Sequence, residues 1–330
     1  MRKYGFNMLW MFIFDGEVAG KPDRKQLEFI AKRGFNFIRV PTDYHFWTKD
    51  YDYLHPNEKA FEVIDSYLQA CREFGLHMSL NVHRAPGYCI NNNTPERHNL
   101  WTDQVAQDGF AFIWEIFAKR YKGISNSELS FDLLNEPPDI GDGGFTRDNH
   151  QQVMRRIIQV IRAIDPTRDI VLNGISGGSD AIPELADTGT IHSGRGYTPF
   201  TISHYRASWV QFEHDWPEPT YPCMLDGDLW DRDMLLQSYQ PWRDVEAKGV
   251  RVHIGEFGCY NKTPNDVALA WLTDLLSVYR ELKWGYALWN FEGPFGIVRH
   301  GRPGAKYELM DGFQIDRALL ELLLDNRVQD

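Results

Sequence analysis

The chain has 330 residues, which is near the upper limit for one hydrophobic core but ordinary for an α/β barrel. Its 43% hydrophobic and 25% charged residues exclude an intrinsically disordered chain, because enough apolar surface exists to offset the entropy of ordering. The net charge of −11 disfavours nucleic acids and membrane surfaces as partners and leaves neutral ligands open. Aromatic residues make up 14% of the chain, so either the core is unusually aromatic or some rings line another surface.

The N-terminal residues 4–14 form a hydrophobic run that superficially imitates a signal peptide. The run contains Gly5 and Asn7 and ends at Asp15 without a small-x-small cleavage site, so we predict a buried first strand. No stretch approaches the ~18 apolar residues of a membrane-spanning helix. We therefore expect a cytoplasmic protein, or a secreted one if a leader has been removed.

Neither the cysteines nor the acidic residues predict a metal site. The four cysteines form no Cys-x-x-Cys pair, so we expect free buried thiols rather than a zinc cluster or a disulfide framework. They are Cys71, Cys89, Cys223 and Cys259. Asp226-Gly227-Asp228, followed by Asp231 and Asp233, resembles part of a calcium loop but lacks its full spacing, so we expect a solvated acidic loop.

A local pattern of a helix-like stretch, a glycine and a short strand-like run occurs four times. The glycines are Gly34, Gly75, Gly249 and Gly285. A glycine just past a helix adopts the left-handed conformation at low cost, and the apolar run after it is the next strand. The pattern therefore predicts repeated βα units.

Eight strand candidates alternate with helical patterns. They are residues 4–10, 35–41, 76–83, 129–135, 169–174, 189–197, 250–256 and 284–290. Eight such units favour a (β/α)₈ barrel, and no Gly-x-Gly-x-x-Gly follows the first strand to suggest a doubly wound dinucleotide fold. No linker composition interrupts the chain, so we predict one catalytic domain over residues 1–330. Two long loops, residues 84–103 and 195–232, are expected on the face where barrel active sites form.

Polar or aromatic side chains stand at the C-terminal ends of several predicted strands, where barrel enzymes build their active sites. Two are glutamates: Glu136 ends a strand in Leu-Leu-Asn-Glu-Pro-Pro, and Glu256 ends another in Gly-Glu-Phe-Gly. A buried carboxylate in such a place is costly unless it is paired or functional. Barrel closure brings these ends towards a common axis, and glycoside hydrolysis requires a pair of carboxyls. The other candidates are Asn7, Arg39, His83, Asn135, Arg195, Tyr197 and Trp289.

These motifs resemble those of glycoside hydrolase family 5, the cellulase-type retaining enzymes. The similarity runs from Asn-Phe-Ile-Arg-Val-Pro at residues 36–41 to the segment at residues 289–297. By position, the resemblance implies that Glu136 is the general acid/base and Glu256 the nucleophile. It implies that Asn135 binds the sugar 2-hydroxyl and that Arg39 supports the nucleophile. The remaining substrate-binding residues that it implies are His83, Tyr197 and Trp289, the last as a platform beneath the sugar.

One position departs from the family pattern. The family usually shows His-x-Tyr at the sixth strand, whereas this chain has Arg195-Gly196-Tyr197. A permanent cation near Glu136 would lower the pKa of that carboxyl, which opposes the raised pKa that a general acid needs. Either Arg195 belongs to the site, or His192 or His204 takes the place of the family's histidine.

The resemblance implies a retaining β-glycosidase acting on a β-linked oligo- or polysaccharide, endo-β-1,4-glucanase-like, with no metal or other cofactor. Alternatives within the family are a β-mannanase, a β-1,3-glucanase or an exo-acting β-glucosidase. A non-catalytic carbohydrate-binding barrel is the alternative from another class, and the presence of both glutamates argues against it.

Several tryptophans are candidates for stacking on sugar rings, whose C–H faces pack on aromatic surfaces. Those in loops or near strand ends are Trp10, Trp47, Trp101, Trp209, Trp216, Trp230 and Trp289. Only Trp289 is placed in the site by its position. Trp114 and Trp271 lie on apolar helical faces, so we expect them in the core.

Overall fold

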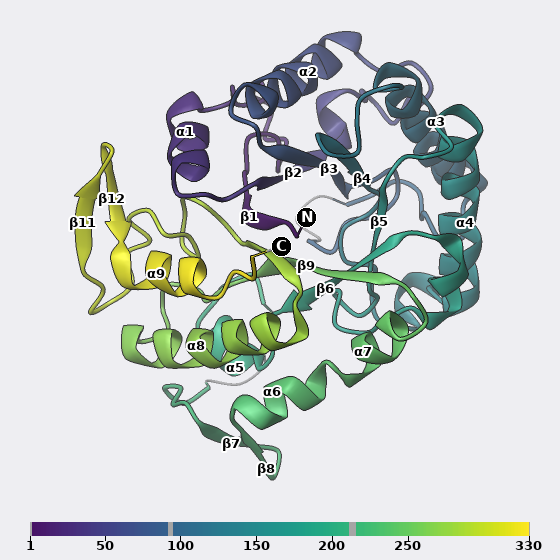
Figure 1. Cartoon of the computed structure of the whole chain (residues 1–330). Coiled ribbons are helices and arrows are strands. Elements are labelled where there is room, and N and C mark those ends of the chain that lie inside the picture. Colours follow the sequence, from purple (N-terminus) through teal and green to yellow (C-terminus); the bar gives the residue numbers. More distant parts are fainter. Residues whose placement is uncertain (1, 92–94, 211–215, 330) are drawn as a thin grey trace.

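The computed structural model describes residues 2–91, 95–210 and 216–329, and its centre is a closed barrel of parallel strands (Figure 1). Around the barrel the strand order is β1-β10-β9-β6-β5-β4-β3-β2. The strands are β1 (Tyr4–Asn7), β2 (Phe37–Asp43), β3 (His77–Arg84), β4 (Leu129–Asp132), β5 (Ile170–Asn173), β6 (Ile191–Gly196), β9 (Arg251–Phe257) and β10 (Gly285–Leu288). The predicted (β/α)₈ barrel is confirmed, and each of the eight strand candidates contributes one strand.

Helices surround the barrel and bury one apolar face each against it (Figure 1). They are α1 (Arg24–Lys32), α2 (Glu58–Glu73), α3 (Gln104–Arg120), α4 (Arg147–Ile164), α5 (Phe200–Ser203), α6 (Arg232–Ser238), α7 (Gln240–Glu246), α8 (Asn265–Leu282) and α9 (Arg317–Asp325). Side-chain caps fix several starts: Thr146 and Asn149 form a reciprocal capping box at α4. Between β5 and β6 the described connection contains a short 3₁₀ helix, Pro183–Thr188, in place of an α-helix.

Several strands end earlier than the sequence predicts. β4 stops at Asp132, so Asn135 and Glu136 lie beyond the strand rather than at its end. Leu133 and Leu134 are still buried, and Leu133 still donates its backbone N–H to Val171 on β5. Glu136 itself has a left-handed backbone with φ of 43°, an uncommon conformation for a residue with a side chain. The apolar run that suggested a longer strand is therefore partly the buried start of a loop.

Three of the four predicted glycine turns are confirmed, at Gly34 (φ 77°), Gly75 (φ 68°) and Gly249 (φ 92°). The fourth is wrong: Lys283 ends α8 in the left-handed conformation, with φ of 58°, and Gly285 is the first residue of β10. A close backbone contact explains why glycine is required at position 285. A Cβ atom there would lie 2.3 Å from the backbone oxygen of Lys3.

Two antiparallel hairpins decorate the barrel. The first pairs β7 (Cys223–Leu225) with β8 (Asp228–Trp230), and the second pairs β11 (Tyr307–Met310) with β12 (Phe313–Asp316). Asp226 and Gly227 form the turn of the first hairpin, and both have positive φ, as Asp-Gly turns of two-residue hairpins do. The acidic segment at residues 226–228 is therefore explained by turn chemistry.

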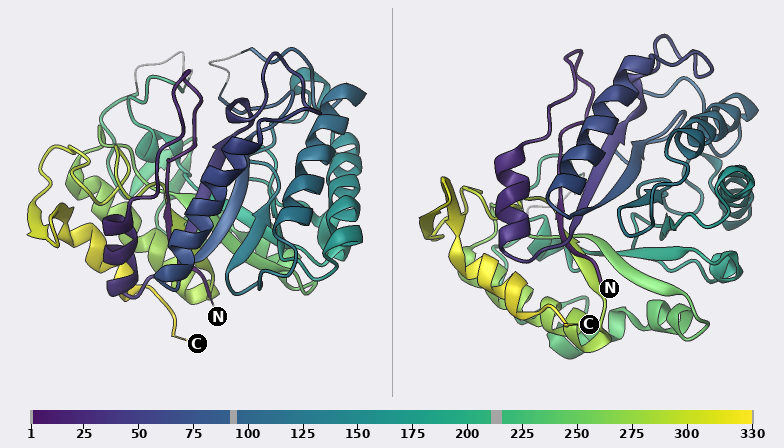
Figure 2. Two further views of the ribbon diagram at one scale, coloured as in Figure 1. Left: turned by 90° about the horizontal axis from the view of Figure 1, so that it is seen from above. Right: turned by 45° about the horizontal axis from the view of Figure 1, so that its top comes forward.

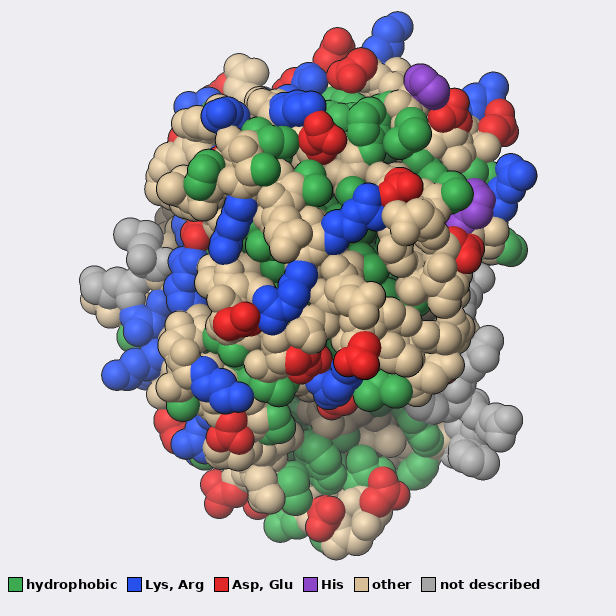
Figure 3. Space-filling model, turned by 90° about the vertical axis from the view of Figure 1, so that its right-hand side faces the viewer, with side chains coloured by type: hydrophobic (Ala, Val, Ile, Leu, Met, Phe, Trp, Pro, Cys, Tyr) green, Lys and Arg blue, Asp and Glu red, His purple; other side chains and the backbone are tan. Residues whose placement is uncertain are grey.

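The two ends of the barrel are distinct. The loop from β1 to α1 rises at one end, whereas both chain termini lie at the other (Figure 2). On the side covered by α3 and α4, basic and acidic side chains are interspersed (Figure 3). Among the described residues, no helix is both long and apolar enough to cross a membrane. All four cysteines are free thiols, and Cys71, Cys89 and Cys259 are buried, whereas Cys223 is partly exposed.

The buried tryptophans of the helices allow a test of how the barrel is stabilised. Trp271, on α8, is completely buried, so Trp271→Ala should lower the free energy of unfolding by about 3–5 kcal/mol. Trp209→Ala is the matched control, because Trp209 is 50% exposed and its truncation leaves no buried cavity. Denaturant titration of both variants measures the difference. Equal losses in the two variants would contradict this account of the core.

Candidate active site

A buried arginine on β2 organises the floor of the candidate site. Arg39 donates from Nε to Asp132 Oδ2 (2.6 Å) and from Nη1 to Asn7 Oδ1 (3.0 Å). The same Nη1 also donates to Glu256 Oε1, and Nη2 donates to Asn135 Oδ1 (2.9 Å). All these side chains are buried. The guanidinium therefore orients Glu256 and Asn135 at once, and its charge is balanced inside the barrel.

A second buried arginine, Arg195 on β6, contacts both glutamates. Its Nε donates to Glu136 Oε1 (2.7 Å), and its Nη2 donates to Glu256 Oε1 (3.2 Å). Nη2 also donates to Asn135 Oδ1 (2.8 Å) and to Asn173 Oδ1. One planar cation thus holds two carboxylates from different strands in a fixed relative orientation.

Of the residues considered at the sixth strand, Arg195 contacts Glu136, whereas His192 and His204 do not. His192 is buried near the start of β6, and neither of its ring nitrogens has a hydrogen-bond partner among the described residues. His204 lines the cleft above and packs against Tyr197, with ring centroids 4.9 Å apart.

The electrostatic surroundings of Glu136 push its pKa in opposite directions. Burial is the largest effect and, together with repulsion from Glu256, raises the pKa to about 7. Arg195 and, more weakly, Arg39 lower it. Arg195 thus acts in the expected direction, but burial and like-charge repulsion outweigh its effect on the pKa. A carboxyl with this pKa is partly protonated at neutral pH and can give up a proton there.

The side chains of Tyr197 and His83 complete the polar part of the site. Tyr197 donates its hydroxyl to Glu256 Oε2 (3.2 Å). Asn135 Nδ2 lies 3.3 Å from His83 Nε2. Burial and the neighbouring arginines lower the pKa of His83 well below its usual value, so the ring is neutral and Nε2 can accept from the amide. His83 also stacks on Trp289, with ring centroids 5.6 Å apart and planes inclined by 26°.

An open cleft of about 1150 Å³ lies above these groups at the C-terminal ends of the strands. Both glutamates, His83, Tyr197 and Trp289 line it. The structure therefore brings all nine predicted site residues into one connected set: Asn7, Arg39, His83, Asn135, Glu136, Arg195, Tyr197, Glu256 and Trp289. The aromatic residues Phe12 and Phe295, which the sequence did not assign to the site, also line the cleft.

Some of the tryptophan candidates line the cleft and others lie in the core. Trp209 and Trp289 line the cleft, whereas Trp47 and Trp101 are buried in the core. Trp114 and Trp271 are completely buried, as predicted.

Sequence reasoning missed the residues that hold the two arginines in place. Asp132 accepts from Arg39 and also from the Asn173 amide, at 2.8 Å. Gly178 has φ of 81°, and a Cβ atom there would lie 2.5 Å from Arg195 Cγ. This glycine belongs to a glycine-rich segment, residues 174–179, which makes room for the arginine. The glycines of this segment were the only sequence signal for a close approach. The sequence does not show that the group approaching Gly178 is Arg195.

No group of three or more His, Cys, Asp or Glu side chains in the described parts of the chain is placed to hold a metal ion. The candidate site is instead built from carboxylates, amides, guanidinium groups and aromatic rings.

The opposing effects on Glu136 lead to a prediction. Arg195→Gln removes a cation that favours the ionised carboxylate, so the pKa of Glu136 should rise above about 7. Carbon NMR titration of the labelled glutamate carboxyls measures this pKa. Arg251→Gln, which removes an exposed arginine at the opposite end of the barrel, should leave the pKa of Glu136 unchanged. A pKa that does not move in Arg195→Gln would show that this arginine has no influence on the carboxyl.

Several known proteins are similar to this chain in sequence and structure. Residues 5–293 match the family model Cellulase (glycosyl hydrolase family 5). The chain is 27% identical to Endoglucanase C of Acetivibrio thermocellus over 313 residues, which covers 87% of this chain and 89% of that one. A crystal structure described as a glycoside hydrolase shares 57% identity and a TM-score of 0.98, with 99% of this chain and 100% of that chain covered.

The endoglucanase Cel5A of Thermotoga maritima, at 21% identity, shares the fold, with a TM-score of 0.78 over 97% of this chain and 96% of that chain. The match to the family model spans the barrel from β1 to the segment beyond β10. The chain therefore belongs to glycoside hydrolase family 5, and it is a glycosidase rather than a non-catalytic sugar-binding barrel.

Proposed function

We propose that the protein is a retaining endo-β-1,4-glucanase that works through Glu136 and Glu256. The observation that carries the proposal is the Arg195 guanidinium, which binds both carboxylates at the floor of an open cleft. A pair of carboxyls held close together is what double displacement at an anomeric carbon needs.

In the proposed first step, Glu256 attacks the anomeric carbon and forms a covalent glycosyl ester. Hydrogen bonds from Arg39, Arg195 and Tyr197 stabilise the carboxylate form of this residue and aim its oxygens. Glu136 donates its proton to the departing glycosidic oxygen, and its raised pKa leaves that proton available near neutral pH. The leaving chain departs as a neutral alcohol.

In the second step, Glu136 is a carboxylate and takes a proton from a water molecule. The hydroxide equivalent attacks the same anomeric carbon, the ester bond to Glu256 breaks, and Glu256 returns to its carboxylate form. Two displacements at one carbon retain the β configuration. The change of role by Glu136 is consistent with a pKa near the working pH.

Substrate binding is proposed for the groups around the two carboxyls. Asn135 is held by both arginines, which leaves its amide nitrogen to donate to a sugar 2-hydroxyl or to His83. Trp289 offers an apolar face at the end of β10 on which a sugar ring can pack. The neutral character of a glucan suits a chain whose net charge is −11.

The preference for β-1,4-glucan rests on the endoglucanase relatives and on the open cleft. A β-mannanase, a β-1,3-glucanase and an exo-acting β-glucosidase use the same two-carboxyl chemistry and differ in the shape of the cleft. Because the chemistry is shared, the substrate has to be decided by measurement.

Separate substitution of the two glutamates tests the assignment of their roles. Glu136→Ala should lower kcat/KM on a polysaccharide about 10²- to 10⁴-fold, because the leaving oxygen is no longer protonated. With a dinitrophenyl β-cellobioside, whose leaving group needs no proton, this variant should still release a rapid burst of phenolate. Glu256→Ala should lack that burst. Glu28→Ala, on the exposed surface of α1, is the control. Turnover near that of the unmodified protein in either active-site variant would refute the assignment.

A product profile tests the substrate. We expect the protein to release short oligosaccharides from carboxymethylcellulose and mixed-linkage β-glucan, with a rapid fall in viscosity that marks internal cleavage. Mannan, xylan and β-1,3-glucan should be cleaved more slowly. NMR of the first product should show the β anomer. Release of glucose alone, without a fall in viscosity, would favour the exo-acting β-glucosidase, and an α-anomer product would overturn double displacement.

A further inference from the structure

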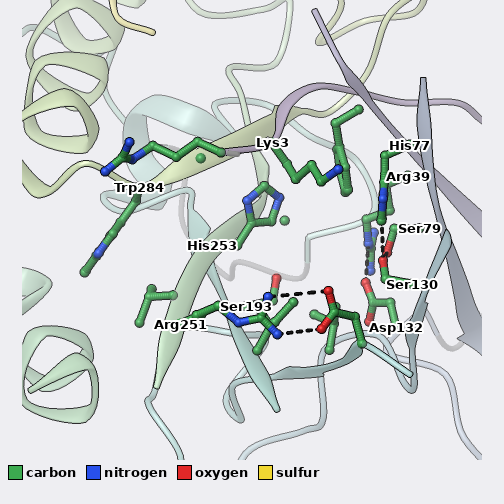
Figure 4. Close-up of a pocket in the computed structure, with 18 of the residues that line it drawn as sticks. Lys3, Arg39, His77, Ser79, Ser130, Asp132, Ser193, Arg251, His253 and Trp284 are labelled. Carbon is green, nitrogen blue, oxygen red and sulfur yellow. Dashed lines mark hydrogen bonds and ion pairs between the residues drawn. The ribbon is translucent and has the colours of Figure 1, made fainter. Parts of the chain in front are cut away.

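A second cavity, of about 400 Å³, lies inside the barrel at the end opposite the cleft (Figure 4). We call it the lower chamber. Its mouth is formed by the first residues of several strands, including Phe37, His77 and Gly285, and its inner end reaches Arg39 and Asp132. It shares no lining residue with the cleft. Barrel interiors are normally filled by layers of large branched side chains. Here small residues are among those that line the cavity: Ser79, Ser130, Ser193, Gly255 and Gly285.

The charge of the lower chamber is unlike that of the whole protein. Five basic and three acidic side chains line it, in a chain with a net charge of −11. Two of the acidic groups are ion-paired: Asp132 with Arg39, and Asp169 with Arg251 at 2.6 Å. The third, Glu246, accepts a hydrogen bond from the Trp284 indole at 2.9 Å. Arg39 also pairs with Glu256, which lies above the chamber, and with that carboxylate counted the basic side chains still outnumber the acidic ones by five to four.

Lys3 supplies a cation without a close partner. Within residues 2–91, 95–210 and 216–329, its ammonium group makes no hydrogen bond or ion pair. The side chain is partly buried and extends across the chamber towards His77 (Figure 4). Burial lowers the pKa of Lys3, and attraction to Asp169 offsets only part of that effect. A partly desolvated ammonium of this kind gains stability from an anion beside it.

Hydrogen-bond donors surround the same space. His253 Nε2 is buried and has no partner among the described residues. His77 Nδ1 lies 3.2 Å from the backbone oxygen of Ser127, which can only accept, so His77 donates there and its Nε2 accepts from Ser130 Oγ at 2.8 Å. Ser79 Oγ lies 3.1 Å from Ser130 Oγ. Burial lowers the pKa of both His77 and His253 to about 3, so at neutral pH each ring is neutral and carries one N–H.

We propose that the lower chamber binds a small oxyanion, phosphate in size and charge, with Lys3 as its counterion and His253 and the serine hydroxyls as hydrogen-bond donors. The excess of positive charge opposes a cation at this place, and a neutral ligand would leave the ammonium without compensation. The volume lies within the range of small-molecule sites and suits a free oxyanion or one attached to a single sugar.

Calorimetric titration of the intact chain with inorganic phosphate, in a buffer free of other oxyanions, tests the proposal. We expect one saturable site per chain. Lys3→Gln should weaken binding about tenfold or more, because a charge-assisted hydrogen bond is lost. Lys122→Gln removes the same charge from an exposed lysine outside the chamber and should leave binding unchanged. Trp289→Ala, in the cleft, should also leave phosphate binding unchanged, which separates this site from the proposed catalytic one.

Two further arms keep the test decisive. Glucose 6-phosphate shows whether the chamber admits an oxyanion attached to a sugar, and saturable binding of either compound supports the site. His253→Gln serves as a second variant if Lys3→Gln does not fold, with circular dichroism as the check on folding. The proposal is overturned if neither compound binds saturably at millimolar concentration, or if binding is the same in folded Lys3→Gln and His253→Gln as in the unmodified chain.

Discussion

Two buried guanidinium groups face three carboxylates, and this contact is the constraint on which the rest of the site depends. Asp132 and Glu256 are buried, and the Glu136 side chain is 15% exposed. Arg39 contacts Asp132 and Glu256, and Arg195 contacts Glu136 and Glu256. Buried charges are tolerated only when paired and hydrogen-bonded, and here the anions outnumber the cations by one. The surplus negative charge is relieved most easily by protonation. Glu136 is the carboxyl whose pKa rises, first because of its burial and then because of repulsion from Glu256.

The demand for room around these charges explains several residues that carry no charge themselves. Gly178 lets the Arg195 stem pass. Gly255 also needs its missing side chain, since a Cβ atom there would lie 2.3 Å from Ser193 Oγ and 3.1 Å from Arg195 Nη1. Ser193 and the backbone oxygen of Gly194 accept from Arg195 Nη1, each at 3.2 Å. Small residues on β6 and β9 therefore leave the space that the charged Arg195 side chain needs. The lower chamber lies directly beneath them.

Arginine in place of the family's usual histidine at position 195 changes the charge beside Glu136 but not the position of the site. An arginine cannot give up its proton, so the charge beside Glu136 is present at every pH at which the protein is folded. Its lowering effect on the pKa of Glu136 is smaller than the combined effect of burial and Glu256. The carboxyl thus keeps a raised pKa beside a permanent cation, which the sequence alone made improbable.

What the sequence determined was local and periodic. Alternation of apolar strands with amphipathic helices predicted the barrel, because each unit must bury one face. The Asn-Glu-Pro and Gly-Glu-Phe-Gly motifs predicted which strand ends carry Glu136 and Glu256. That residues 1–330 form one catalytic domain stays a prediction. The local reading was wrong at Gly285, where contact with Lys3, from the far end of the chain, and not a helix end, requires a glycine.

What only the tertiary structure decided depends on distances between strands far apart in the chain. These include the contact of Arg195 with both glutamates, the support of that arginine by Asn173, and the sign of the pKa shift of Glu136. The charged lower chamber beneath the site likewise became visible only in the tertiary structure. Electrostatic energies depend on the distance between charges and on their burial. Both quantities are set by the folded barrel and cannot be deduced from the order of the residues alone.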